Sequence, residues 1–230
     1  MNDRQREILS ALNVSDKKIE EMNSRKLNIR EKSFLDTAII MLDYLEDKYD
    51  NKFEIVSGNI PNETDENYWI NAHALKGEHA YKNFSTYLKN GTCSDEFFNI
   101  LRRDEVSLYI TKLLNKSIDN IKAYVNISYD YGKEFNSETK ISEIISKCEF
   151  TINVAYYGPN TSKEEFDIIA NKVETILNNK NIKFDGEVIC FINEIDSINT
   201  NEELTNALRK RSDENRVYNF YKNIFCNDYV

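Results

Sequence analysis

The spacing of hydrophobic residues predicts that residues 1–60 are mainly helical. From Asn28 onward, apolar side chains recur at intervals of three and four, which places them on one side of a helix. Asn28 and Glu31 have the spacing of a capping box, in which each side chain bonds a free amide at the helix start. Ser15 predicts an earlier helix, because its hydroxyl can accept bonds from the amides that follow. The buried side of the main helix is expected to contain Phe34, Leu35, Ala38, Met41, Leu42, Leu45 and Tyr49.

Three short segments with a period of two predict strands after this helix. They are FEIVSG from Phe53, YWINAHAL from Tyr68 and FSTYL from Phe84. The Asn90-Gly91 pair has the chemistry of a turn and should end the third strand. The pattern then predicts a helix over residues 94–116, whose apolar side includes Val106, Tyr109, Ile110, Leu113 and Leu114.

The segment IKAYVNISYDYG, residues 121–132, alternates as a strand does. Ala123, Val125, Ile127, Tyr129 and Tyr131 share one face, which is predicted to be buried. Lys122, Tyr124, Asn126, Ser128 and Asp130 share the other face, which is predicted to be solvated. A structural role is therefore expected for the tyrosines of the first face, and a recognition role stays open only for Tyr124.

A β-α-β unit is predicted in the C-terminal part of the chain. A short helix over residues 141–145 precedes the strand FTINVAYY. Either Thr161 with Glu164 or Ser162 with Glu165 forms a capping box before the next helix. The strand GEVICFIN follows, and the crossover is long enough for the two strands to be parallel. A polar helix over residues 201–211 and a closing strand VYNFYKNIF complete the pattern.

Together these elements predict an α+β fold with a helical N-terminal segment and one or two mixed sheets packed with helices. The expected division is a helical segment over residues 1–27 and a globular domain over residues 28–230. That domain can also be divided into subdomains over residues 28–117 and 118–230.

Charge composition favours a protein partner over nucleic acid or a membrane surface. The 230 residues contain 30 Lys and Arg against 39 Asp and Glu, which gives a net charge of −9. Such a surface repels phosphate groups, and the best basic patch, residues 209–211, is short and flanked by acids. The charged N-terminus contains no apolar stretch of signal length, so we expect a cytoplasmic protein. A basic protein is the expected partner, and the oligomeric state stays open.

Known catalytic motifs are absent from the sequence. It contains no glycine-rich phosphate loop of the form GxGxxG or GxxxxGK[ST], and no GxSxG elbow. The four cysteines are widely separated without a CxxC pair, and Cys190 within VICFI is expected in the core. We therefore expect no cofactor and no disulfide framework.

A metal-dependent hydrolase is the alternative hypothesis. Glu194 and Asp196 follow the strand VICFIN, and active sites of open sheets gather at carboxyl ends of strands. His73 or His79 would assist them as metal ligands. Cys93 or Asp95 would enlarge a zinc set around the two histidines, although the spacing does not enforce it, and Cys93 is also a candidate thiol nucleophile.

Acidic residues near the C-terminal end of the main helix are the predicted partner-binding site. Acids at this end oppose the helix dipole, which makes the cluster unusual. A solvated helix face, a cation site and a docking face for a basic partner are the three explanations of it. Aromatic anchors are common at the centres of protein interfaces. The predicted partner-binding residues are the acids Asp43, Glu46, Asp47 and Asp50, with Tyr44 or Trp69 as the aromatic anchor.

The phrase DYLEDKYDNKFEIVSG resembles a group of uncharacterised proteins of low-GC Gram-positive bacteria and their mobile elements. The resemblance rests on Tyr44, Leu45, Lys48 and Tyr49, followed by residues 53–56, and it continues through IKAYVNISYDY and FTINVAYY. It covers the middle two thirds of the chain. Some members resemble lipoproteins, but this sequence lacks their signal and lipid-attachment cysteine. The resemblance implies a non-enzymatic accessory role and no catalytic residue.

Three hypotheses of function follow. The first is a non-enzymatic, acidic, cytosolic protein of the immunity or inhibitor type, which neutralises a basic toxin or defence factor by protein–protein binding. The second is the metal-dependent hydrolase with Glu194, Asp196 and His73 or His79. The third is a structural or oligomerisation module in which residues 1–27 pack onto a neighbouring chain.

Overall fold

The computed structural model describes residues 1–59, 67–127, 135–192, 195, 197–209 and 218–226. These residues divide into two compact units. The N-terminal unit contains the described residues up to Leu101 together with residues 135–138. The C-terminal unit contains residues 102–127 and the described residues from 139 onward.

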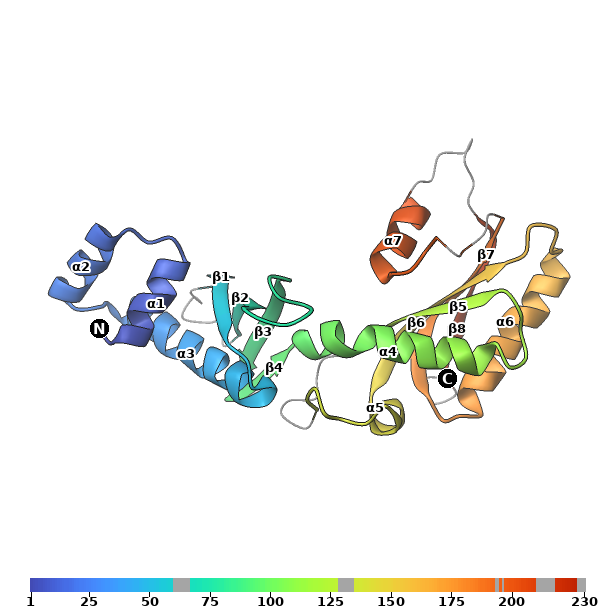
Figure 1. Ribbon diagram of the computed structural model, residues 1–230, viewed down its shortest axis with the longest axis horizontal. Coiled ribbons are helices and arrows are strands. Elements are labelled where there is room, and N and C mark those ends of the chain that lie inside the picture. Colours follow the sequence, from blue (N-terminus) through green and yellow to red (C-terminus); the bar gives the residue numbers. More distant parts are fainter. Residues whose placement is uncertain (60–66, 128–134, 193–194, 196, 210–217, 227–230) are drawn as a thin grey trace. The chain divides into compact units, whose positions relative to one another are not determined.

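The N-terminal unit combines helices with an antiparallel sheet. Three helices come first, α1 (Asp3–Ala11), α2 (Asp16–Arg25) and α3 (Ile29–Tyr49). Four strands follow in the spatial order of the sequence (Figure 1), namely β1 (Phe53–Gly58), β2 (Tyr68–Ala74), β3 (Phe84–Lys89) and β4 (Thr92–Asp95). Each neighbouring pair of strands is antiparallel.

The core of this unit lies between α3 and one face of the sheet. Ile70, Ala72 and Ala74 of β2 are fully buried on that face. An aromatic cluster closes one end of the core, where the Tyr49 and Phe97 ring centroids lie 5.0 Å apart at an interplanar angle of 85°. The other cluster members are Phe53 and Phe84. Full burial of such side chains stabilises the fold by about 1.5–3 kcal/mol each.

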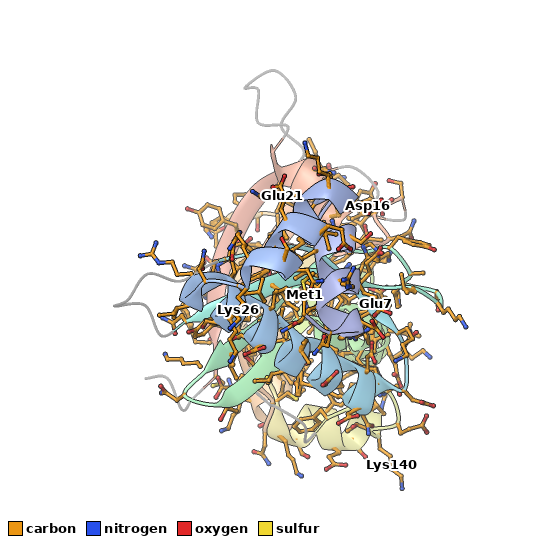
Figure 2. The ribbon with its side chains drawn as sticks, turned by 90° about the vertical axis from the view of Figure 1, so that its left-hand side faces the viewer. Met1, Glu7, Asp16, Glu21, Lys26 and Lys140 are labelled. Carbon is orange, nitrogen blue, oxygen red and sulfur yellow. The ribbon has the colours of Figure 1, made fainter. Side chains whose placement is uncertain are left out.

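Helices α1 and α2 pack against their own chain through a small set of apolar side chains. Ile8, Leu9, Ile19 and Met22 are buried. Arg4 of α1 also forms an ion pair with Glu46 of α3 at 2.6 Å. Figure 2 shows the charged residues Glu7, Asp16, Glu21 and Lys26 on the outside of this helical pair.

The capping predictions are confirmed at Asn28 and corrected at Ser15. The Asn28 side chain accepts from the amide of Glu31, and the Glu31 carboxylate accepts from the amide of Asn28. Ser15 does precede α2, but its hydroxyl makes no capping bond to that helix.

The C-terminal unit has a mixed four-stranded sheet in the order β5-β6-β7-β8. Its elements after α4 (Phe97–Leu114) are β5 (Ile121–Ile127), α5 (Ile141–Lys147), β6 (Glu149–Tyr157), α6 (Lys163–Asn178), β7 (Lys183–Phe191), α7 (Asn201–Arg209) and β8 (Tyr218–Phe225). The central pair β6–β7 is parallel, and the two outer pairs are antiparallel.

The crossover from β6 to β7 through α6 confirms the predicted β-α-β unit. Of the two possible capping boxes, the structure contains the one between Ser162 and Glu165. Phe166, Ala170, Val173 and Leu177 form the buried side of α6.

The predicted start of the fourth helix is wrong. Residues 92–95 pair with β3 as strand β4, because the Asn90-Gly91 turn folds the chain back onto the sheet. Helix α4 begins at Phe97 and ends at Leu114, close to the predicted end at Lys116. Tyr109, expected on its apolar side, is 38% exposed.

The prediction that Tyr124 is solvated is also wrong. Tyr124 is buried, and its hydroxyl donates to the carbonyl of Ile198 at 2.7 Å. Ile195, Ile198 and helix α7 cover this part of the second face of the sheet, where Tyr124 packs with Ile189, Phe191 and Leu204. Tyr129 and Tyr131 lie outside the described residues.

The α+β fold is confirmed, with N-terminal helices and two four-stranded sheets, of which one is mixed. Among the helices of the described ranges, none has both the length and the apolar composition needed to cross a membrane.

Candidate functional site

In the described part of the N-terminal unit, the buried carboxylate of Asp95 is the centre of a hydrogen-bond network. It accepts hydrogen bonds from the Tyr44 hydroxyl at 2.7 Å, the Lys48 ammonium at 2.8 Å and the Tyr49 hydroxyl at 2.7 Å. The amides of Phe97 and Phe98, at 2.9 and 3.2 Å, complete the set. We call Asp95 with Tyr44, Lys48 and Tyr49 the Asp95 centre.

Burial controls the protonation of the groups around Asp95. The side chain of Lys48 is only 4% exposed, and desolvation lowers its pKa while the Asp95 carboxylate opposes that shift. Desolvation also raises the pKa of Tyr44 and Tyr49, and the negative charge of Asp95 raises both further. Both phenols are therefore neutral donors at physiological pH.

The Asp95 centre joins α3, β4 and the first residues of α4, which all belong to the N-terminal unit. Its tyrosines and lysine come from α3, its carboxylate lies at the end of β4, and the two amides open α4. Since both carboxylate oxygens already accept several donors, the arrangement is suited to holding these elements together.

The free energy of unfolding should fall as pH rises above about 9. Burial raises the pKa of Cys148 to about 12, and it raises the pKa of Tyr44, Tyr49 and Tyr124. The unfolded chain loses these protons at lower pH than the folded chain. Their contribution is thus complete below about pH 8. Above the pKa that each group has in the unfolded chain, it is lost at roughly 1.4 kcal/mol per group and pH unit. Lys48, whose pKa is lowered, has the opposite sign and offsets part of the loss.

Urea unfolding at neutral pH and near pH 10.5, with tyrosinate absorbance recorded in parallel, measures this dependence. Equal stability at both pH values would contradict it.

The predicted acidic cluster is only partly available to a partner. Asp43 and Asp47 of α3 and Asp50, the C-cap residue that follows it, are exposed. Glu46 accepts from Arg4 at 2.6 Å and from Lys52 at 2.5 Å, and these cations lower its pKa against the effect of burial. The structure therefore leaves three of the four acids at the surface.

The two candidate aromatic anchors lie in different environments. Tyr44 is buried in the Asp95 centre, which corrects its assignment as a surface anchor. Trp69 is half-buried on the face of the sheet opposite to Ile70, and Ile70 faces the core under α3. Trp69 and the exposed acids of α3 therefore do not form one continuous surface.

Trp69 lines a hollow of about 570 Å³ at the start of β2 and the β3–β4 turn. Trp69 is paired across the sheet with Tyr87, and Tyr87 with Ser94. We call this cavity the Trp69 hollow. Its lining consists of Asn67, Tyr68, Trp69, Tyr87, Leu88, Lys89, Asn90, Thr92, Cys93 and Ser94.

A chain of polar contacts fixes the sheet beside the Trp69 hollow. Asn71 donates to the Ser57 hydroxyl at 3.0 Å and accepts from the Ser85 hydroxyl at 3.1 Å. The Glu96 carboxylate accepts from the amide of Ser85 and from the Tyr87 hydroxyl, at 3.1 and 3.3 Å. The hollow is thus built on strands whose side chains already hold one another in place.

The two histidines have separate neighbours. His73 lies 3.2 Å from the Glu54 carboxylate, with its ring centroid 5.2 Å from that of Tyr81. His79 contacts the Lys82 ammonium at 3.1 Å. Across the described part of the chain, no three His, Cys, Asp or Glu side chains form a group that could hold a metal ion.

The other candidate residues for catalysis or metal binding are Glu194, Asp196 and the cysteines. Glu194 and Asp196 lie outside the described residues. Cys93 is a half-buried thiol in the lining of the Trp69 hollow, while the thiols of Cys148, Cys190 and Cys226 are buried. The core position predicted for Cys190 is confirmed.

The sequence contained only part of the signal for the Asp95 centre. An aspartate shortly before an apolar helix is a capping signal, and it could have identified Asp95 as the start of α4. Nothing in the spacing could have indicated its pairing with Lys48, because 47 positions separate the two residues.

Comparisons of the chain with protein-family models, curated proteins and solved structures found no match.

Proposed function

We propose that this protein acts by binding a protein partner, as an inhibitor or immunity-type protein, and that the Trp69 hollow receives the partner. The observation that carries the proposal is the hollow itself. It offers Trp69 and Tyr87 from one face of the sheet, and Tyr68 and Leu88 from the other, as apolar lining at the end of a fixed sheet. Interface hot spots combine such aromatic side chains with pockets that a partner can desolvate.

The size and lining of the hollow suit a side chain that protrudes from another protein. Its volume of about 570 Å³ exceeds that of one large side chain and lies in the range of specific binding pockets. Asn67, Asn90, Thr92 and Ser94 provide hydrogen-bonding groups at the rim. An apolar centre with a polar rim is the common anatomy of protein interfaces.

The acidic charge supports a basic partner through steering. The chain has a net charge of −9, and Asp43, Asp47 and Asp50 extend the negative surface on α3. These acids lie on the helix side of the sheet, so we assign them to long-range attraction and assign contact to Trp69. Charge of this kind raises the association rate and has less effect on dissociation.

Replacing Trp69 with alanine should weaken partner binding about 30-fold or more, as expected for loss of a hot-spot aromatic residue. The partner is first captured from the native host with the wild-type chain and identified by mass spectrometry. The purified pair is then measured by calorimetry. Trp69 is the only tryptophan in the chain, so its fluorescence in the wild type reports directly on occupation of the hollow.

Tyr81→Ala is the matched control for this experiment. Tyr81 is an exposed aromatic residue of the same unit, at 69% exposure, and it does not line the hollow. Its replacement should leave affinity within about twofold, as for residues outside a hot spot. A partner that binds Trp69→Ala as tightly as the wild type would exclude the Trp69 hollow as its binding site.

A further inference from the structure

Two adjoining hollows lie at the carboxyl end of β6 in the C-terminal unit, where ligands commonly bind in sheets with parallel strands. Their volumes are about 580 and 390 Å³, and they share Asn120 and Tyr157. The larger is lined also by Tyr156, residues 158–161, Glu165, Ile168 and Ile169. The smaller is lined also by Thr111, Asn115, Ile121, Lys122 and Ile195. We call the pair the β6 groove.

The backbone around the groove is fixed by specific contacts. Asn120 has a positive φ of 56°, and its carbonyl accepts from the amide of Tyr157 at 2.9 Å. The amide of Gly158 donates to the carbonyl of Phe191 at 3.0 Å. A side chain at Gly158 would collide with the Tyr156 ring and the Thr161 hydroxyl, so glycine allows both to pack close to the backbone.

The charged groups of the groove are already engaged. The Glu165 carboxylate accepts from the amide of Ser162 at 2.9 Å in the capping box. The Lys122 ammonium donates to the carbonyl of Ile198 and, at 3.1 Å, to the Asn199 side chain. These contacts engage the Lys122 ammonium and one oxygen of Glu165, so the groups that the groove offers are mainly neutral amides and hydroxyls, which favours a neutral ligand.

Each hollow offers the same kinds of groups. The larger combines Tyr156, Asn160 and Thr161, and the smaller combines Asn115 and Thr111. The Tyr156 and Thr161 hydroxyls lie 3.4 Å apart, the Asn115 amide donates to the carbonyl of Ile121 at 3.3 Å, and the Thr111 hydroxyl accepts from the amide of Ala123 at 2.9 Å. Each of these groups keeps further hydrogen-bonding capacity for a ligand. Tyr157 and the Asn120 amide lie between the two hollows, in the lining of both. Tyrosine rings provide apolar faces, while amides and hydroxyls both donate and accept hydrogen bonds.

We infer that the β6 groove binds a neutral carbohydrate of at least two linked sugar units. Sugars present apolar C–H faces suited to the tyrosines and hydroxyls suited to the amide and threonine side chains. Two adjoining hollows of similar lining match two linked rings. This site lies in the C-terminal unit and is independent of the Trp69 hollow, so Trp69→Ala should not affect it.

The test uses the full-length ¹⁵N-labelled chain and NMR titration with N,N′-diacetylchitobiose, cellobiose and maltose, each beside its monosaccharide. We expect at least one disaccharide to shift amide signals of residues 120–122 and 157–165, and to bind more tightly than its monosaccharide. Asn120→Gly keeps the positive φ and removes the amide, so it should weaken that disaccharide roughly fivefold.

Asn181→Gly is the matched control, since Asn181 also has a positive φ, of 52°, and does not line the groove. It should leave the affinity unchanged. Asn160→Ala, at an exposed loop position, is a second test that does not alter the strand or the helix, and it should also weaken binding.

The inference is overturned if no disaccharide shifts these signals, or if Asn120→Gly and Asn160→Ala both bind as the wild type does. Adenosine serves as a neutral aromatic probe. Shifts at the same residues with adenosine and none with the sugars would assign the groove to a base and overturn a carbohydrate ligand. Equal affinity for disaccharide and monosaccharide would overturn the two-ring assignment.

Discussion

Replacing Asp95 with asparagine should lower the free energy of unfolding of the N-terminal unit by about 3–5 kcal/mol. Asparagine has nearly the same shape but no charge, so the buried Lys48 ammonium loses its counterion. Its amide group is a donor, and it would face the hydroxyl of Tyr44 or Tyr49, both of which donate to Asp95 in the wild type. Urea unfolding followed by Trp69 fluorescence measures the effect in the unit that contains the Asp95 centre.

Two further variants separate the ion pair from the rest of the Asp95 centre. Asp43→Asn makes the same chemical change at an exposed position of α3 and should change stability by less than about 0.5 kcal/mol. Lys48→Met combined with Asp95→Asn removes both charges, so it should be more stable than Asp95→Asn alone. A single Asp95→Asn variant within about 1 kcal/mol of the wild type would show that Lys48 is not held by this carboxylate.

The importance of Asp95 for stability bears on the partner hypothesis. Asp95 and Ser94 are neighbours in β4, and Ser94 lines the Trp69 hollow. Cys93, also in that lining, adds to the raised pKa of Tyr44. The centre and the hollow thus share one strand, and the buried ionic group fixes the strand that forms one wall of the proposed binding site.

Local patterns predicted most elements of this fold. The helix periodicity of α3 and the capping boxes at Asn28 and Ser162 depend on residues within a few positions of each other. The parallel pairing of β6 and β7 was also predictable, because a strand–helix–strand pattern restricts the connection between neighbouring strands. The sequence is informative wherever the interacting groups are close along the chain.

Contacts between distant residues could not be predicted from local patterns. Tyr124 alternates with apolar residues and was therefore predicted on a solvated face, but Ile195, Ile198 and Leu204 cover it. Tyr44 lies between acidic residues in the sequence of α3, but its hydroxyl donates to the carboxylate of Asp95, 51 positions away. Tyr44 and Tyr124 are both buried at positions where the sequence pattern predicts a polar residue. Their aromatic rings pack against apolar neighbours, and the hydroxyl at the end of each side chain finds a hydrogen-bond partner.

The predicted partner site shows the same limit. Helical spacing correctly placed Asp43, Asp47 and Asp50 on the exposed side of α3. It could not show that Arg4 and Lys52 engage Glu46, or that Trp69 lies on the opposite side of the sheet. Surfaces made from several elements depend on tertiary packing, and one sequence contains no direct signal for them.

Replacing Gly186 with alanine should lower the free energy of unfolding of the C-terminal unit by about 3 kcal/mol or more. This value is at the upper end of what a strained backbone conformation costs in proteins. Gly186 lies in β7 opposite Ile152 of the parallel strand β6, with a φ of +154°. An added Cβ would overlap the carbonyl oxygen of Ile152 and lie 2.7 Å from its carbonyl carbon. The obstacle is backbone at the centre of the sheet, so only separation of the two strands can relieve it.

Gly77→Ala is the control that isolates this clash from the cost of the backbone conformation. Gly77 also has a positive φ, of +97°, but an added Cβ there would meet nothing within 4 Å. We therefore expect a loss of only about 1–2 kcal/mol in its own unit.

For Gly186→Ala, the unfolding transition measured by Trp69 fluorescence should stay near its wild-type midpoint. Amide exchange of β6 and β7 should accelerate, because Trp69 reports on the N-terminal unit and the clash lies in the other. If exchange in β6 and β7 were unchanged, the close approach of Gly186 to Ile152 would not be a constraint on the sheet.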